Sequence, residues 1–258
     1  MSAPRLTAVL VAEAIGTFLF FFVGMGAVVL GSHAGDGGGG LVGVALAHGL
    51  ALAVLVSALG PISGAHFNPA VTFAVWLTGR IDITRAGMYI AVQLIGAVMA
   101  GFALRAVFPE SSWRPVALGT PAVDAGMGVV GAITIEAILT VVLLIAVFGT
   151  AIDRRAPKLG GLAIGLAVAA DILMGGPLTG AAMNPARWFG PAVASGTFAD
   201  WYVWWIGPLV GAAVAALIYR FVLEDTAEAD VTPAMPEGSS GARCIKNEMP
   251  SRRFTRRR

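Results

Sequence analysis

Long stretches without a single Asp, Glu, Lys or Arg fill most of the first 223 residues of this chain. A helix needs about 20 mostly apolar residues to cross a bilayer, and helices are expected there because backbone groups in lipid must bond to one another. Since 57% of the residues are hydrophobic and only 12% are charged, we predict an all-α integral membrane protein. The uncharged runs cover residues 14–35, 37–79, 86–104, 137–152, 159–170 and 201–219.

These runs predict six transmembrane helices and leave two apolar segments that are too short to span the bilayer. Each short segment, 68–77 and 184–194, begins with Asn-Pro, an N-cap residue followed by the residue best suited to the first helical position. Ten residues reach about 15 Å, half of the roughly 30 Å hydrocarbon core. We therefore expect two re-entrant half-helices. The six spans are expected at about 8–30, 41–60, 83–107, 129–150, 159–176 and 201–222.

The two halves of the chain repeat one another. GAHFNPAVTF at 64–73 matches GAAMNPARWF at 180–189, and each half, about 6–107 and 129–222, holds three spans and one half-helix. Because three is an odd number, the second half must enter the bilayer from the opposite side, which makes an inverted repeat. The amino ends of the two half-helices are then expected to meet at the midplane.

Basic residues between the spans set the expected orientation. Arg80 and Arg85 flank one connection and residues 154–158 hold three more basic side chains, whereas residues 31–40 hold none. The positive-inside rule therefore places both termini in the cytoplasm. We expect the plasma membrane as the location.

The character of the sequence changes after residue 223. Acidic residues are followed by a segment rich in Pro, Ser and Gly and then by SRRFTRRR. We therefore expect a membrane domain over residues 1–223 and a disordered cytoplasmic tail over residues 224–258. The single cysteine, Cys244, lies in this tail and excludes an internal disulfide.

The segments ISGAHFNPAVT and TGAAMNPARWFGPA, with six spans and a Glu early in each half, resemble the aquaporin (major intrinsic protein) family over about residues 6–222. The water-channel branch is favoured, because Trp188 stands where glycerol-conducting relatives usually carry Asp. The resemblance implies a passive channel for water and for small neutral solutes such as ammonia or hydrogen peroxide, which excludes ions and protons. It also implies a homotetramer in the lipid bilayer.

The paired Asn-Pro-Ala motifs are expected to form the centre of the pore. The side-chain oxygens of Asn68 and Asn184 can cap their own half-helices while the amides donate to a passing water. Each helix N-terminus carries about half a positive charge, which opposes cations in a narrow pore of low dielectric. The motifs consist of Asn68, Pro69 and Ala70 in the first half and Asn184, Pro185 and Ala186 in the second.

The non-helical backbone before each motif cannot face lipid, so its carbonyl groups are expected to line water. In the family such carbonyls form a ladder of acceptors. His66 has two interpretations, a side chain packed near the cytoplasmic mouth or a donor that lines the pore. The residues expected to supply the carbonyls are Gly64, Ala65, His66, Gly180 and Ala182.

The resemblance also places a selectivity filter of four residues at the outer side of the motifs. They are His48, Ile172, Ala181 and Arg187, a set that resembles the filter of plant tonoplast aquaporins. Arg187 and His48 supply donors, whereas Ile172 removes a hydrogen-bonding partner and leaves room for small solutes. A His48 that merely packs in its helix is the alternative.

Three acidic residues fall inside expected spans, where a carboxylate is costly and must face the protein interior. Glu13 and Glu136 occupy matching places in the two halves, and in the family such residues hold the re-entrant loops. A proton relay is the alternative, but only Asp171 could extend it. Asp171 itself either faces a neighbouring helix or pairs with a donor near the outer vestibule.

Two alternatives to a water channel stay open. One is a glycerol or ammonia facilitator, and the other is a secondary transporter, because inverted repeats and broken helices also build transporters. An enzyme is not expected, since the sequence has no phosphate-binding loop or nucleophile pattern. We expect no cofactor, no bound metal and no nucleic-acid partner.

Overall fold

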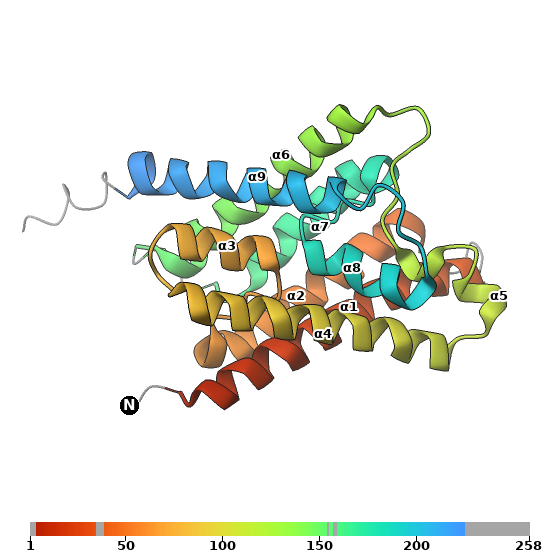
Figure 1. Ribbon diagram of the computed structural model, residues 1–258, viewed down its shortest axis with the longest axis horizontal. Helices are drawn as coiled ribbons and strands as arrows, with labels where there is room; N and C mark the ends of the chain where they lie inside the picture. Colours follow the sequence, from red (N-terminus) through yellow and green to blue (C-terminus); the bar gives the residue numbers. More distant parts are fainter. Residues whose placement is uncertain (1–3, 35–38, 154, 157–158, 225–258) are drawn as a thin grey trace, which may run out of the picture.

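The computed structural model describes residues 4–34, 39–153, 155–156 and 159–224. Within these residues, six helices are long and apolar enough to cross a membrane. They run roughly side by side, with the N-terminus and the end of α9 at one end of the molecule and α5 at the other (Figure 1). Four of them are α1 (Leu6–Ala34), α2 (Gly40–Ser63), α4 (Ile83–Val107) and α7 (Leu162–Thr179). The other two are α6 (Val129–Val147), which is extended to Ile152, and α9 (Val203–Ile218), which is extended to Leu223.

Short helical segments complete the described fold. At the same end of the molecule as the N-terminus, α6 continues into the π-helix η3 (Phe148–Ile152) and α9 into the π-helix η4 (Tyr219–Leu223). The connection between α4 and α6 carries a short helix, α5 (Glu110–Trp113), and a 3₁₀ turn, η2 (Ala117–Gly119). Most of the expected disordered tail, from residue 225 onward, lies outside the described residues.

The two half-helices are α3 (Pro69–Leu77) and α8 (Pro185–Ser195), as the Asn-Pro signals predicted. Figure 1 shows them in the middle of the bundle with their amino ends facing one another. The Oδ1 atom of Asn68 accepts from the backbone N–H of Ala70 at 2.8 Å, and that of Asn184 accepts from Ala186 at 3.0 Å. Because an N-cap bond satisfies a free backbone donor, each half-helix can begin inside the membrane without water.

Glycines let the spanning helices approach at the level of their backbones. A Cβ atom added to Gly165 of α7 would lie 2.2 Å from the carbonyl oxygen of Gly49 in α2, and one added to Gly211 of α9 would lie 2.2 Å from that of Ala137 in α6. Any side chain at these positions would force the helix pairs apart. Close packing through small residues is the usual means of helix association in lipid.

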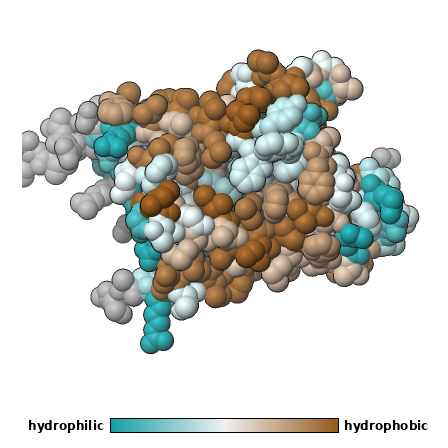
Figure 2. Space-filling model, viewed as in Figure 1, coloured by the Kyte–Doolittle hydropathy of each residue, from teal (hydrophilic) through white to brown (hydrophobic). Residues whose placement is uncertain are grey.

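The face shown in Figure 2 is mostly apolar between two ends that carry most of its strongly hydrophilic residues. Large hydrophobic side chains such as Leu50, Val54 and Val130 are more than half exposed. In water such a surface would be costly, but in hydrocarbon it has no cost. The fold is therefore an all-α membrane bundle with two re-entrant half-helices.

Candidate functional site

A cavity of about 240 Å³ runs along the interior, past the junction of the two half-helices. Its wall is mostly aliphatic and aromatic. Its polar groups come from the two loops that precede α3 and α8, from both Asn residues, and from His48, Arg80 and Arg187. We call this cavity the passage. It is lined by Phe20, Phe21, His48, Leu52, Val56, Gly64, Ala65, His66, Phe67, Asn68, Val71, Val75, Arg80, Leu143, Val147, Ala151, Ile152, Ile164, Val168, Ile172, Ala181, Ala182, Met183, Asn184 and Arg187.

The junction of the half-helices is held by bonds that cross between the two halves of the chain. The Nδ2 atom of Asn68 donates to the carbonyl oxygen of Met183 at 2.9 Å, and that of Asn184 donates to Phe67 at 3.0 Å. A carboxamide carries two N–H hydrogens, so one is used across the junction and one is left for the passage. Sequence analysis expected the amides to donate to water in the passage and did not anticipate this cross-link.

The loops that enter α3 and α8 have unusual backbone geometry. Ala65 and Phe67 have φ values of 51° and 48°, and Ala181 and Met183 have 43° and 50°. A positive φ at a residue with a side chain costs about 1 to 3 kcal/mol and persists only where the surroundings enforce it. The two loops adopt the same strained form in both halves, so each must have a partner that holds it.

Glu13 is the partner of the first loop. Its two carboxylate oxygens accept from the backbone N–H groups of His66 at 3.0 Å and Phe67 at 2.9 Å. Further donors are the Ser63 hydroxyl at 2.7 Å and the Gln93 amide at 2.9 Å. A fully buried carboxylate with four donors is compensated for the loss of its hydration.

Glu136 has the equivalent place in the second half. It accepts from the backbone N–H groups of Ala182 at 2.9 Å and Met183 at 2.7 Å, and from the Thr179 hydroxyl at 2.7 Å. Both glutamates are completely buried and neither lines the passage. The geometry is that of a support for the loops rather than a chain of groups that relays protons.

All four residues predicted as a filter line the passage. The Nε atom of Arg187 donates to the Nε2 atom of His48 at 3.1 Å. The two residues are 139 positions apart in the chain, and both are more than nine-tenths buried. Ile172 and Ala181 supply apolar wall at the same passage. The four predicted positions thus bring two polar and two apolar side chains to the passage.

The connection between α4 and α6 supplies a fifth group that sequence analysis missed. The Nη1 atom of Arg187 donates to the carbonyl oxygen of Gly119 at 2.7 Å. Ala117, Leu118 and Gly119 have consecutive positive φ values of 44°, 56° and 73°. This left-handed turn points one carbonyl group at the guanidinium. Runs of three such residues have no simple sequence signal, although Gly119 suits its conformation.

His66 lines the passage on the other side of the Asn residues. Its Nδ1 atom lies 3.1 Å from the Thr72 hydroxyl, and its ring lies 5.1 Å from the ring of Tyr89. His66 therefore packs against neighbouring side chains, as the first interpretation expects, and also borders the passage, as the second expects.

Three residues singled out from the sequence lie away from the passage lining. Gly180, expected to offer a carbonyl, ends α7 with φ of 78° and packs against Pro121. Asp171 is 3% exposed, and its Oδ2 atom has no hydrogen-bond partner among the described residues. Trp188 is buried and stacks on Trp204, with ring centroids 5.7 Å apart. Of the two settings considered for Asp171, a place against neighbouring helices agrees with this burial.

Known proteins are similar to this chain over most of its length. The family model described as major intrinsic protein matches residues 1–219. Aquaporin TIP4-4 of Zea mays is 47% identical over 214 residues, which cover 81% of this chain and 83% of that protein. Probable aquaporin TIP3-2 of Arabidopsis thaliana is 44% identical over 224 residues, covering 82% of each chain.

A solved structure supports the fold. The X-ray structure of the aquaglyceroporin from Plasmodium falciparum superposes with a TM-score of 0.76, covering 87% of this chain and all of that one, at 23% sequence identity. The two plant relatives are named as aquaporins of the tonoplast (TIP) type, so the expected location in the plasma membrane gains no support from them.

Proposed function

This chain belongs to the major intrinsic protein family and is a water channel of the aquaporin type, and we propose that water crosses the bilayer through the passage between its half-helices. One observation carries the proposal. Asn68 and Asn184 meet on the passage, each with one amide hydrogen left over from the bonds that join the two halves. A water molecule at the junction can accept from both amides.

Ion exclusion follows from the charges around this point. The amino ends of α3 and α8 face one another, and each presents about half a positive charge. Arg187 adds a full charge at the filter, in surroundings where water screens little. A cation would therefore lose hydration and meet repulsion at two successive positions, whereas a neutral solute would lose only hydrogen bonds that the loops replace.

The filter residues favour small neutral solutes beside water. Arg187 supplies the donors to a solute, because both ring nitrogens of His48 are bonded within the protein, to Arg187 and to the carbonyl oxygen of Val44. Ile172 and Ala181 add apolar wall to the passage. Ammonia and hydrogen peroxide are small and can use the donors of Arg187. Glycerol needs several polar contacts around its three hydroxyl groups, and an aliphatic wall supplies none.

Further features of the proposal concern the whole molecule. We place both termini in the cytoplasm, with a conducting domain over residues 1–223 built of inverted halves at about 6–107 and 129–222. The channel is passive and performs no enzymatic reaction. The apolar side chains exposed on α2 and α7 are consistent with burial against lipid and against other subunits of a homotetramer.

Stopped-flow light scattering of proteoliposomes tests the function. Vesicles with the protein should shrink faster under osmotic shock than empty ones, with a low activation energy and without ionic current. The same vesicles in ammonia, hydrogen peroxide and glycerol give the solute range, with glycerol expected to be excluded. Shrinkage no faster than in empty vesicles would end the proposal, and saturable uptake dependent on an ion would favour a transporter.

A further inference from the structure

The end of the passage opposite the filter is bordered by a cation. Arg80 follows the last turn of α3, where Gly79 has a φ of 74° and the Arg80 backbone N–H donates to the carbonyl oxygen of Val75 at 3.1 Å. Its side chain lines the passage together with Val75 and Ile152. We call this end the inner mouth, since it lies on the side of the molecule that carries the N-terminus (Figure 1).

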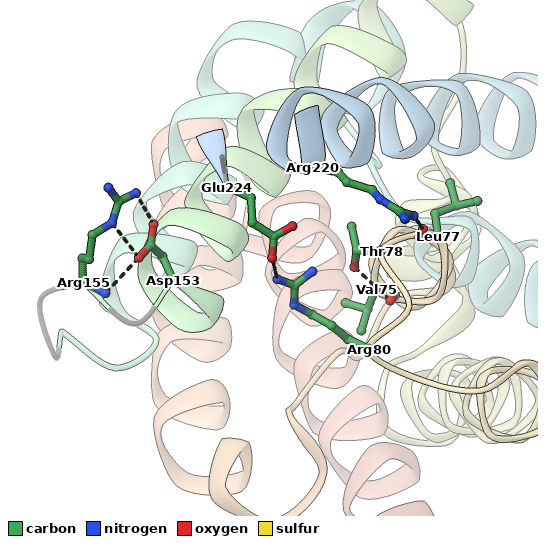
Figure 3. A network of polar contacts seen from close by, with 8 residues as sticks. All are labelled: Val75, Leu77, Thr78, Arg80, Asp153, Arg155, Arg220 and Glu224. Atoms are coloured by element: carbon green, nitrogen blue, oxygen red, sulfur yellow. Dashed lines mark hydrogen bonds and ion pairs between the residues drawn. The ribbon is translucent and has the colours of Figure 1, made fainter. Parts of the chain in front are cut away.

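Arg80 is held by residues from the far end of the chain. Its Nη2 atom lies 2.6 Å from the Oε1 atom of Glu224, 144 positions away, and its guanidinium lies 5.2 Å from the centre of the Tyr219 ring. Tyr219 in turn stacks on Phe148 with ring centroids 4.5 Å apart. Figure 3 shows Arg80 and Glu224 directed at one another across the gap between α3 and η4. Because its side chain is only 28% exposed, this guanidinium is screened less than a free surface charge.

The direction of α3 explains why a cation is needed here. The half-helix directs its positive amino end at the midplane, so its negative carboxyl end lies at the inner mouth. That end alone would attract the cations that the centre of the passage repels. Arg80 offsets it, as does Arg220, whose Nη1 atom reaches the Leu77 carbonyl oxygen at 3.5 Å.

We propose that Arg80 is a second specificity-determining residue, which keeps the potential of the inner mouth positive, and that Glu224 is a positioning residue which holds it against the wall. The proposal rests on the passage being the water pathway. Figure 3 draws one further acid in this region, Asp153, which directly follows Ile152. Its negative charge is paired, because Nη2 of Arg155 lies 2.9 Å from its Oδ2 atom. Solutes entering from the cytoplasm thus meet a charge filter before the half-helix junction.

A thiol reporter measures this potential without relying on transport. Ala151 is exposed and lines the passage, so Ala151→Cys in a Cys244→Ser background places a single thiol at the inner mouth. The purified protein in nanodiscs is labelled with an anionic and with a cationic methanethiosulfonate of similar size. The ratio of the two labelling rates reports the local potential, because a unit charge at contact distance in water changes the local concentration of a monovalent ion about fivefold.

Arg80→Gln should lower the anionic-to-cationic ratio about fivefold or more, since it removes the cation and leaves Glu224 unpaired. Glu224→Gln should raise the ratio, since it removes the counter-charge alone. Arg114→Gln is the matched control, because Arg114 forms its own ion pair with Glu110 at the other end of the molecule and should leave the ratio unchanged.

A ratio that stays within about twofold in Arg80→Gln overturns the proposal. If the anionic-to-cationic labelling ratio falls in Arg80→Gln but does not rise in Glu224→Gln, the charge filter is supported and the role of Glu224 is overturned. If Arg80→Gln does not fold, Glu224→Gln alone decides, and an unchanged ratio there overturns the proposal. Osmotic water flux of the unsubstituted protein is measured separately, so a failure of the water channel is distinguished from a failure of this inference.

Discussion

Arg187 donates its Nε hydrogen to the Nε2 atom of His48 over 3.1 Å, which requires His48 to accept at that nitrogen. The other ring nitrogen, Nδ1, lies 2.9 Å from the carbonyl oxygen of Val44 and must therefore carry the proton. The two bonds together specify one neutral tautomer of the imidazole. The filter thus has a single full positive charge, on Arg187, and a ring that orients it.

Replacing the imidazole of His48 and the aliphatic side chain of Ile172 should change which solutes pass through the channel. In the double variant His48→Phe with Ile172→His, the apolar ring at position 48 can no longer accept from Arg187, and the introduced imidazole narrows the passage. We expect ammonia and hydrogen peroxide permeability to fall by about tenfold, with water flux retained. A solute panel by stopped flow measures this. Unchanged solute permeability would contradict the assignment of the filter.

The left-handed turn of η2 should control the orientation of Arg187. Gly119→Ala places a side chain at φ of 73°, with its Cβ atom 3.1 Å from that of Val28. The strain of about 1 to 3 kcal/mol should shift the turn and remove the acceptor of the guanidinium. We expect a lower thermal midpoint and higher permeability to small solutes. Gly128→Ala, in the same connection, is the control, because its φ is −74° and a Cβ atom would have no neighbour within 4 Å.

The carboxylate of Glu136 should be necessary for the form of the second loop. In Glu136→Gln one acceptor oxygen is lost, so a buried backbone N–H of Ala182 or Met183 is left without a partner. The cost of such a group is about 1 to 3 kcal/mol. We expect a lower thermal midpoint in detergent and reduced water flux in vesicles.

Asp171→Asn is the matched control for that variant. Asp171 is as deeply buried, but its Oδ2 atom accepts no hydrogen bond from the residues that the structure describes. Its replacement removes no bond, and a neutral amide costs less to bury than a charged carboxylate. The midpoint should stay the same or rise. Equal losses in the two variants would show that burial, and not the bonds of Glu136, determines the effect.

Local chemistry explains why the half-helices were predictable. Asn68-Pro69 and Asn184-Pro185 define a helix start by capping and by the fixed φ of proline, and neither depends on distant parts of the chain. The expected segments, 68–77 and 184–194, agree with the structure to within one residue at each end. The six spans followed from hydrophobicity and length in the same way.

Groups from distant segments account for what the sequence did not indicate. The carbonyl of Gly119 reaches Arg187 only because a connection without regular hydrophobic pattern folds back over the filter. Arg80 was assigned to the orientation of the chain, yet it borders the passage because the end of η4 binds it through Glu224. Such contacts depend on tertiary placement, which periodicity and capping do not encode.

Mercurials should leave the water flux of this channel unchanged. Its single thiol, Cys244, lies in the tail and outside the described residues, whereas the passage is lined by residues without sulfhydryl groups. Ala181 borders the passage beside Arg187 and is 2% exposed, so a mercury ion bound to a thiol there would fill the filter. Ala181→Cys in a Cys244→Ser background should therefore conduct water until mercuric chloride is added, and a reducing thiol should restore the flux. Block of the unsubstituted protein that persists in Cys244→Ser, or an Ala181→Cys channel that mercury does not affect although mass spectrometry shows the adduct, would place the water pathway elsewhere.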